Sequence, residues 1–275
     1  MTPPVRRAGV LGHPVAHSLS PALHRAAYRE LGLDWDYQAI DVTPDHLAEF
    51  LDSLDSRWVG LSLTMPLKEA VLPFLASIDD LARRLGVVNT VLLAPNGARH
   101  GANTDVPGLV QVLTEAEVAA GADVTLLGGG ATARSTLAAL GIHGAGRVTV
   151  CARRADAGRQ LVDLGVELGL TVRARGFDEA SEALAADLVV ATVPAGATDG
   201  LAASVPARPG TLVEVVYDPW PTRLAAGWAA AGGSVVGGLE LLVHQAHEQL
   251  WLMTGERVPT DLLRAAGSAA LADRS

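Results

Sequence analysis

The stretch Val124-Thr125-Leu126-Leu127-Gly128-Gly129-Gly130-Ala131-Thr132-Ala133-Arg134 decides the fold of this chain. Its first four residues are mostly apolar and predict a short buried strand, and residues 132–140 follow a helical pattern. Between them lies the pattern G-x-G-x-x-A. The first glycine permits a tight turn, the second lets a pyrophosphate approach the backbone, and the small third residue lets the helix pack on the strand. The stretch therefore predicts a dinucleotide-binding unit, with a glycine turn that binds no ligand as the alternative.

The end of the next predicted strand, 148–151, indicates which dinucleotide binds. Proteins that bind NAD place an Asp or Glu there to hold the ribose 2′-hydroxyl. Here Arg153 and Arg154 occupy that position, and Asp156 lies too far into the next helix to serve. Two guanidinium groups suit a 2′-phosphate, because arginine can bind phosphate oxygens in a bidentate fork. We therefore predict NADP(H) as the cofactor, with a solvated basic loop as the alternative role of the two arginines.

Short apolar strands alternate with helical patterns along the whole chain, which predicts an α/β fold with mostly parallel sheets and helices on both faces. The predicted strands cover residues 7–11, 37–42, 59–63, 87–93, 124–127, 148–151, 171–174, 188–192 and 212–215. The predicted helices cover residues 21–31, 106–120, 132–140, 157–168 and 239–253, with further helices starting at 43–44 and 259. The turn 95–97 predicts a hairpin. Because the pattern restarts near residue 105, we predict two α/β lobes. The last helices could pack on either lobe.

The composition argues against several classes of protein. A formal net charge of -9 and an aromatic content of 4% argue against nucleic acid as the main partner. No run approaches the ~18 apolar residues that a membrane helix needs, and no apolar segment follows the charged N-terminus as in a secretory signal. The single cysteine, Cys151, rules out an internal disulfide framework and favours the reducing cytoplasm.

Two serines, Ser18 and Ser20, lie between the first predicted strand and the first predicted helix. Two hydroxyl groups beside the positive end of a helix form a suitable binding site for a carboxylate. The structural alternative for Ser20 is an N-cap, because Pro21 follows it. No G-x-S-x-G elbow surrounds either serine, so the sequence does not support a hydrolase triad. We predict no metal site.

Other polar residues follow predicted strands. Lys68 closes the run 62–68, Asn89 lies in 86–90 and Asp105 closes 101–105. Taken singly, each is more often structural than catalytic. Lys68 could be a surface residue at a helix start, and Asp105 could be the N-cap of the next helix. Together, a lysine and an aspartate near the mouth of a dinucleotide-binding fold can move a proton while the cofactor moves a hydride.

In their order along the chain, these segments resemble the shikimate dehydrogenase family. The signatures of that family are G-x-P-x-x-H-S-x-S-P, (N/S)-x-T-x-P-x-K, G-x-x-N-T, N-T-D-x-x-G, the glycine turn, Y-D-P-x-P-T and G-x-x-x-L-x-x-Q. The chain matches them at residues 12–21, 62–68, 86–90, 103–108, 128–134, 217–222 and 238–245. Seven matches in the same order are not expected by chance.

The resemblance implies a substrate-binding lobe formed by residues 1–104 and 239–275 and a Rossmann-type NADP-binding lobe formed by residues 105–238. The C-terminal helices would return to the first lobe. The implied activity is the reversible, NADPH-dependent reduction of 3-dehydroshikimate to shikimate, a step of chorismate and aromatic amino acid biosynthesis. The implied partner is this small-molecule substrate, bound by a cytoplasmic monomer or homodimer without a role for nucleic acid or membrane.

The resemblance also implies roles for single residues. Lys68 would be the acid or base, and Asp105 would orient the reacting hydroxyl and hold Lys68. The implied substrate-binding residues are Ser18, Ser20, Thr64, Asn89, Tyr217 and Gln245. The predicted cofactor-binding residues are Gly128, Gly129, Gly130, Ala131, Thr132, Ala133, Arg153, Arg154 and Gly238.

The chain departs from the family pattern at three places. Ser62 replaces the asparagine of many members and has a shorter hydrogen-bonding side chain. The run 191–194 (ATVP) replaces N-A-T-S, and Arg154 replaces the threonine of N-R-T. None of these changes touches Lys68 or Asp105. Two alternatives stay open: an enzyme that oxidises quinate or an aminated shikimate analogue, in one version with NAD, and a noncatalytic NADP-binding sensor.

Overall fold

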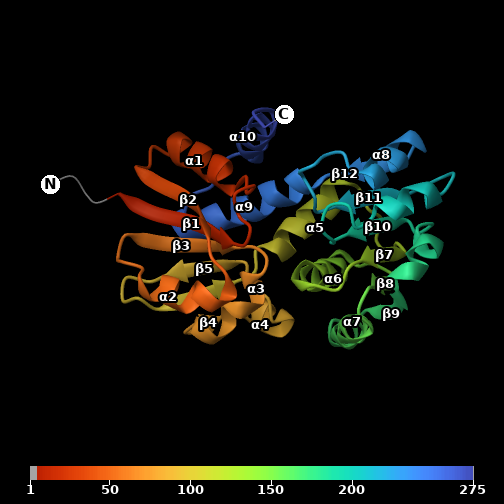
Figure 1. Ribbon diagram of the computed structural model, residues 1–275, viewed down its shortest axis with the longest axis horizontal. Helices are drawn as coiled ribbons and strands as arrows, with labels where there is room; N and C mark the ends of the chain where they lie inside the picture. The colour runs from red at the N-terminus through yellow and green to blue at the C-terminus, as the bar shows by residue number, and fades with distance from the viewer. Residues whose placement is uncertain (1–4, 275) are drawn as a thin grey trace. The chain divides into compact units, whose positions relative to one another are not determined.

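The computed structural model describes residues 5–274, which fold into two compact α/β units (Figure 1). The first unit contains the chain up to Thr104 together with the chain from Leu242 onward, and the second unit is Asp105–Leu241. The predicted α/β class and the predicted return of the C-terminal segment to the first lobe are confirmed. The sequence places that return at residue 239, and the compact units place it at Leu242.

A six-stranded sheet lies at the centre of the first unit, in the order β2-β1-β3-β5-β6-β4. Its strands are β1 (Arg6–Gly12), β2 (Trp35–Asp41), β3 (Trp58–Leu63), β4 (Ser77–Ile78), β5 (Thr90–Leu93) and β6 (Arg99–Ala102). β1 is parallel to both neighbours, whereas β5 is antiparallel to β3 and to β6. The predicted hairpin is the β5–β6 pair. In this arrangement the carboxyl ends of β1 and β3 lie at the same edge as the amino end of β5.

The helices of the first unit come from both ends of the chain. They are α1 (Ser20–Glu30), η1 (Pro44–His46), α2 (Leu47–Asp52), α3 (Leu67–Ala70), η2 (Leu72–Phe74), α4 (Asp80–Leu85), α9 (Gly238–Thr254) and α10 (Thr260–Ala272), in which η marks a 3₁₀-helix. α9 begins in the second unit and continues into the first. α10 packs against α1, and the Arg274 guanidinium donates to the His17 carbonyl at 2.9 Å. These contacts attach the C-terminal helices to the first unit.

The second unit is built on a fully parallel sheet in the order β12-β11-β10-β7-β8-β9. Its strands are β7 (Val124–Leu127), β8 (Arg147–Ala152), β9 (Thr171–Gly176), β10 (Leu188–Ala191), β11 (Thr211–Glu214) and β12 (Ser234–Val236). Its helices are α5 (Asp105–Glu115), α6 (Ala131–His143), α7 (Ala155–Glu167), η3 (Phe177–Ala183), η4 (Asp199–Ser204) and α8 (Arg223–Ala230). Counted from β7, the order is 3-2-1-4-5-6, which is the dinucleotide-binding arrangement.

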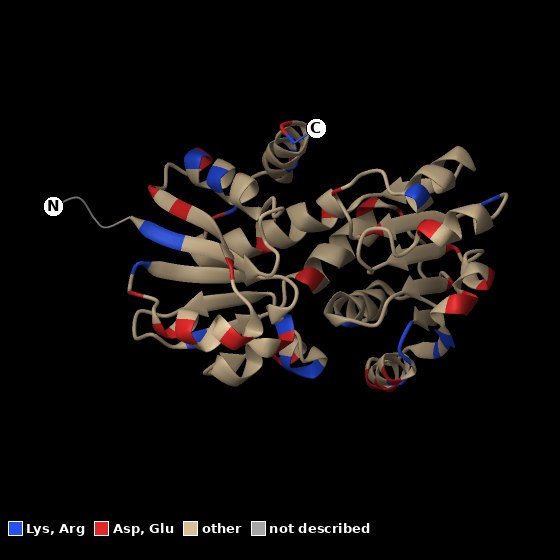
Figure 2. Cartoon of the chain, in the orientation of Figure 1, with Lys and Arg blue, Asp and Glu red and all other residues tan. Residues whose placement is uncertain are grey.

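Figure 2 displays the charged residues mostly on helices and at the ends of strands, while the central strands of the second sheet are largely uncharged. All four residues of β7 and all four of β10 are buried. Strands covered on both faces read as continuous apolar runs, and this is why both were predictable from the sequence. None of the helices within residues 5–274 is long and apolar enough to cross a membrane.

Two predicted boundaries are wrong for local reasons. The expected strand 87–93 begins only at Thr90, because the Val88 amide donates to the Lys68 carbonyl at 2.9 Å and not to a neighbouring strand. The expected helix 106–120 ends at Glu115. Just beyond it Glu117 has a φ of 52°, a left-handed conformation that a helix cannot continue through.

The expected helix at Thr43-Pro44 begins as the 3₁₀ turn η1. The Thr43 side chain caps no amide of this turn, and its hydroxyl lies 2.9 Å from the His46 ring nitrogen. The sequence prediction also missed β4, α4, α8 and β12. Each is short, between two and eight residues, and therefore too short to display a clear hydrophobic period.

Candidate active site

The glycine turn lies between β7 and α6, where the strand order of the second sheet reverses. Gly128 has a φ of 127°, a conformation that residues with side chains rarely adopt. A Cβ atom there would overlap the hydroxyl of Thr192, which follows β10. Thr192 donates this hydroxyl to the Leu127 carbonyl at 3.0 Å. The turn is thus braced at the switch point of the sheet, which is where ligands bind in open parallel sheets.

Gly130 leaves room for a phosphate group. A Cβ atom on Gly129 would lie 2.9 Å from the Cβ of Ala157, whereas one on Gly130 would meet no atom within 4 Å. Gly130 is the N-cap of α6, and no side chain caps this helix. The first amides of α6 lack intrahelical acceptors and carry the positive end of the helix dipole. This open, uncapped helix start fits a dinucleotide pyrophosphate on residues 128–133.

Arg153 and Arg154 follow β8 directly and are exposed. The Arg154 guanidinium lies 3.8 Å from the Asp156 carboxylate. Arg153 has no acidic partner within residues 5–274. Arg153 can therefore bind a 2′-phosphate without giving up an ion pair, and it is the stronger candidate of the two.

The structure gives the predicted cofactor residue Gly238 a packing role. A Cβ atom there would overlap the backbone of Val215 and Val216, and the Gly238 amide donates to the Val216 carbonyl at 3.0 Å. Gly238 thus allows the start of α9 to cross closely over the chain that follows β11.

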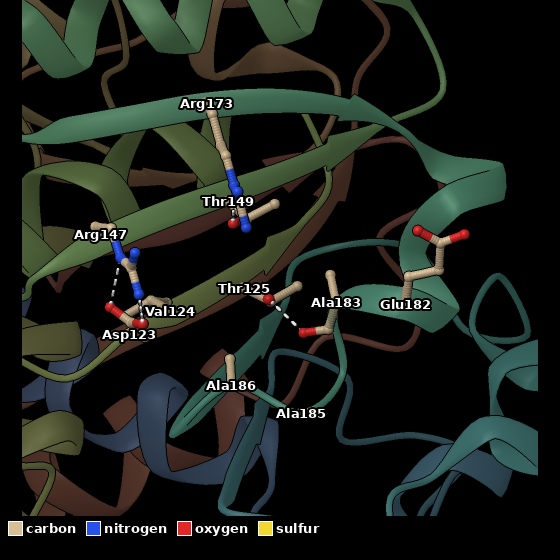
Figure 3. Close-up of a pocket in the computed structure, with 10 residues that line it drawn as sticks. All are labelled: Asp123, Val124, Thr125, Arg147, Thr149, Arg173, Glu182, Ala183, Ala185 and Ala186. Carbon is tan, nitrogen blue, oxygen red and sulfur yellow. Dashed lines mark hydrogen bonds and ion pairs between the residues drawn. The ribbon is translucent and has the colours of Figure 1, made fainter.

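A pocket opens at the opposite edge of the second sheet, around the amino ends of β7, β8 and β9 (Figure 3). It is lined by Asp123, Val124, Thr125, Arg147, Thr149, Arg173, Glu182, Ala183, Ala185 and Ala186. Arg147 pairs with Asp123, and Arg173 Nε donates to the Thr149 hydroxyl at 2.9 Å. The glycine turn follows the carboxyl end of β7, so this pocket is not the predicted dinucleotide site.

Ser18 and Ser20 lie at the amino end of α1. Ser20 is the first residue of the helix and is 4% exposed, while the N-cap is Leu19 and no side chain caps the helix. The alternative role of Ser20 as N-cap is therefore wrong. The Ser18 hydroxyl accepts from the Ser20 amide at 3.3 Å. The hydroxyls of Ser18 and Ser20 beside this uncapped helix start remain consistent with a carboxylate-binding site.

The chain from the end of β3 to the start of α3 carries Thr64 and Lys68. The Thr64 amide donates to the Leu11 carbonyl at 2.9 Å, and a Cβ atom on Gly12 would overlap the Thr64 methyl group. Lys68 is the second residue of α3 and is half-buried. Its carbonyl accepts from the Val88 amide. Three motifs that are distant in sequence thus meet at one edge of the first sheet.

Asn89 is held from two sides at this edge. It is 1% exposed, its Oδ1 accepts from the Thr104 amide at 2.8 Å, and its Nδ2 donates to the Thr104 hydroxyl at 2.9 Å. Asp105, which is 4% exposed and begins α5, follows Thr104 directly. One peptide bond therefore connects the predicted catalytic aspartate to the residue that binds Asn89.

The positions of Gln245 and Tyr217 say less about their proposed substrate roles. Gln245 is 7% exposed and its Nε2 donates to the Leu242 carbonyl at 3.0 Å. Tyr217 follows β11 in the second unit and is half-buried.

Sequence reasoning missed Gln249, one helical turn after Gln245. The available signal was the spacing of four, which places two glutamines on the same helix face.

A buried carboxyl group that sequence reasoning also missed lies at the end of β11. Glu214 is 1% exposed and accepts from the Thr222 hydroxyl and, at 3.4 Å, from the Thr198 hydroxyl. Thr222 also caps α8 by accepting from the Ala225 amide at 3.0 Å. Burial raises the pKa of Glu214 above its ordinary value of 4.5, although both hydroxyl donors lower it. The only sequence signal was an acidic residue closing an apolar strand.

We expect the stability of the Glu214→Gln variant, relative to the wild type, to rise with pH. A carboxyl group with a raised folded pKa stabilises the fold through its bound proton below the unfolded pKa. The wild type loses this contribution as pH rises through the folded pKa, whereas glutamine does not ionise. Urea unfolding of both proteins between about pH 4.5 and about pH 8 measures the difference. A difference that stays constant or falls with pH would contradict the raised pKa.

The sequence model described as the shikimate dehydrogenase substrate binding domain matches residues 10–91. The chain is 38% identical over 285 aligned positions to a protein from Geobacter sp. (strain M21) named shikimate dehydrogenase (NADP(+)), covering 99% of this chain and 98% of that protein.

Solved structures agree with the sequence comparison. Mycobacterium tuberculosis shikimate dehydrogenase has a TM-score of 0.88 and 40% identity, covering 96% of this chain and 99% of that chain. A Thermus thermophilus shikimate 5-dehydrogenase in complex with NADP(H) and shikimate has a TM-score of 0.85 and 34% identity, covering 97% and 100%. A Corynebacterium glutamicum quinate dehydrogenase in complex with NAD has a TM-score of 0.86 and 27% identity, covering 96% and 99%. On the identity and coverage of these relatives, the chain belongs to the shikimate dehydrogenase family.

Proposed function

We propose that this protein catalyses the reversible reduction of 3-dehydroshikimate by NADPH, which yields shikimate and NADP⁺. One observation carries the proposal. The segments of Ser18, Lys68 and Asn89 meet at one edge of the first sheet, in a chain that is 34% identical to an enzyme crystallised with NADP(H) and shikimate. By its family, the reaction belongs to chorismate and aromatic amino acid biosynthesis.

The proposed roles of the first-unit residues follow from their chemistry. Reduction turns the substrate ketone into an alkoxide, which needs a proton. The ammonium group of Lys68 polarises the ketone oxygen and then donates that proton, which is general acid catalysis worth about 10²–10⁴-fold. The hydroxyls of Ser18 and Ser20 bind the substrate carboxylate, and Thr64, Asn89 and Gln245 hold ring hydroxyls.

In the second unit we assign Asp105 to the reacting hydroxyl and Tyr217 to the neighbourhood of the carboxylate. Residues 128–133 would hold the cofactor and Arg153 its 2′-phosphate, and the bound cofactor would supply the hydride.

The cofactor preference is testable at Arg153. We expect Arg153→Ala to raise KM for NADP about tenfold or more, because a charge-assisted hydrogen bond contributes about 1.5–3 kcal/mol. KM for NAD should stay almost unchanged, because NAD lacks the 2′-phosphate. Arg154→Ala should have a smaller effect, since this guanidinium already lies 3.8 Å from Asp156. Equal losses with NADP and NAD in steady-state assays would mean that Arg153 does not recognise the 2′-phosphate.

Quinate is the second candidate substrate, because the chain also resembles a quinate dehydrogenase in complex with NAD. The exposed Arg153, with no acidic residue directly after β8, favours NADP and counts against an NAD-dependent quinate dehydrogenase. Parallel assays of shikimate and quinate, each with NADP and with NAD, test the proposal. The highest kcat/KM is expected for shikimate with NADP, and a preference for quinate with NAD would overturn it. No turnover with any pair would favour a noncatalytic sensor.

We further propose a cytoplasmic location, which the single cysteine supports. Cys151 is fully buried, and burial raises its thiol pKa to about 11, so it is poorly suited to disulfide exchange. We propose a monomer or homodimer that acts on a small molecule, without a nucleic acid or membrane partner.

A further inference from the structure

Six buried polar side chains of the first unit form one hydrogen-bond network, which includes the proposed substrate residue Asn89. They are Tyr37, Ser62, Asn89, Thr90, Thr104 and Gln249, and none is more than 5% exposed. The network joins β2, β3, β5 and α9 within a single compact unit. Buried polar groups are costly unless they are satisfied, so a network of this size restricts the orientation of each member.

Gln249 lies at the centre of this network. Ser62 and Thr90 are opposite each other on the antiparallel strands β3 and β5. The Gln249 carboxamide bridges this pair, since its Oε1 accepts from the Ser62 hydroxyl at 2.7 Å and its Nε2 donates to the Thr90 hydroxyl at 3.0 Å. Its Nε2 also lies 3.4 Å from the Asn89 carbonyl. Gln249 of α9 thus supplies the longer hydrogen-bonding side chain that is missing at position 62.

The donors and acceptors form a directed chain. Because Ser62 gives its only hydroxyl proton to Gln249, Tyr37 must donate in their 2.5 Å hydrogen bond. On the other side, Thr90 accepts from Gln249 and donates its own proton to Asn89 Oδ1 at 2.9 Å. Asn89 Oδ1 is therefore held as an acceptor, and the Nδ2 group is held on the other side of the carboxamide.

We infer that Gln249 is a positioning residue for substrate binding: through Thr90 it reinforces the carboxamide orientation that Thr104 also holds, so that Asn89 presents its amide nitrogen to a ring hydroxyl. The inference rests on the proposed function, because it names what orients one of the proposed substrate residues. Gln249 itself touches neither substrate nor cofactor in this scheme. Its loss would leave the Thr90 hydroxyl able to turn away from Asn89 Oδ1, and would weaken the hold on an oxygen that the Thr104 amide also contacts at 2.8 Å.

The network keeps its direction across the ordinary pH range. Burial raises the pKa of the Tyr37 hydroxyl, although the Ser62 and Ser20 hydroxyls lower it. Tyr37 therefore stays a donor. His24, which stacks on Tyr37 with a centroid distance of 4.0 Å, has its pKa lowered by burial to about 4 and stays neutral. A pH-dependent change in a Gln249 variant would therefore come from the substituted side chain.

Gln249→Leu and Met253→Ala form a matched pair for the test. Leucine places an apolar side chain at 249 and removes the hydrogen bonds to Ser62, Thr90 and the Asn89 carbonyl. Met253 lies on the same helix and packs against Gly60 of β3, so its truncation weakens the attachment of α9 without touching the network. We expect Gln249→Leu to raise KM for shikimate about tenfold while KM for NADP stays within about twofold. Met253→Ala should lower the melting temperature without changing either KM.

Gln249→Glu tests the orientation directly, also in case the leucine variant fails to fold. A protonated glutamic acid can accept from Ser62 and donate to Thr90 as glutamine does, whereas the ionised form cannot donate. Burial raises the pKa of such a group. The ratio of variant to wild-type KM for shikimate should therefore be near one at low pH and should rise as the pH increases. A ratio that is independent of pH would overturn the inference.

Different experimental outcomes would contradict the role of Gln249 and the proposed function. Equal KM changes in Gln249→Leu and Met253→Ala, or an unchanged KM in a folded Gln249→Leu protein, would reduce Gln249 to a structural residue while the wild type still oxidises shikimate. A wild type that turns over neither shikimate nor quinate would overturn the proposed function first, and the inference with it.

Discussion

Replacement of Lys68 by alanine is expected to lower kcat by about 10²–10⁴-fold, the range of general acid–base catalysis. The expected loss is in kcat because the proton is transferred in the transition state and the interaction is weak in the ground state. The backbone role of this position should survive, since the contact that holds the neighbouring segment is made by the Lys68 carbonyl, which accepts from the Val88 amide. The measurement is steady-state kinetics in both reaction directions.

Two controls accompany the Lys68→Ala measurement. The melting temperature should stay close to that of the wild type, and the affinity for NADP should not change, because the predicted cofactor residues all lie in the second unit. A folded Lys68→Ala protein with nearly normal kcat would eliminate Lys68 as the proton donor. A lysine that only held the loop would instead change the melting temperature and leave kcat in place.

Asp105→Asn should produce the second largest effect. The substitution keeps the size of the side chain and removes its charge, so the reacting hydroxyl loses a charge-assisted hydrogen bond of about 1.5–3 kcal/mol. This corresponds to roughly 10- to 150-fold in kcat/KM, divided between kcat and KM. Asp105 is 4% exposed, and asparagine at this position still begins α5 with a short polar side chain.

The Lys68→Ala, Asp105→Asn double variant tests whether the two residues act as one unit. Residues that serve a single proton transfer give losses that are far less than additive. We therefore expect the double variant to be little slower than Lys68→Ala alone. Losses in kcat that multiply would mean that the two side chains serve independent steps, and the proposed joint role would be wrong.

The sequence alone determined the dinucleotide half of the protein. β7 and β10 are buried on both faces, so their apolar runs are visible without any knowledge of neighbours. The glycine turn was equally readable, because it depends on backbone conformations that only glycine adopts easily, such as the φ of 127° at Gly128. The same local logic identified Arg153 as the group that follows β8.

The sequence revealed the motifs of the first unit but not how their residues contact one another. Lys68, Asn89 and Asp105 were identified by their order along the chain, and singly each had an ordinary structural explanation. The hydrogen bonds between Asn89 and Thr104 join residues 15 positions apart. Such contacts depend on strand register, which no local sequence signal specifies at this sheet edge.

Only the tertiary structure decided the roles of Gln249 and Glu214. Gln249 binds side chains 187 and 159 positions away, because the last helices return to the first unit. Ser62, which the sequence marked as a shortened arm, becomes part of a complete network through that return. Glu214 is charged in sequence yet buried in the fold, where hydroxyls from two loops satisfy it. Local propensity specifies strands and turns, whereas burial and pairing of polar groups depend on which distant segments the fold brings together.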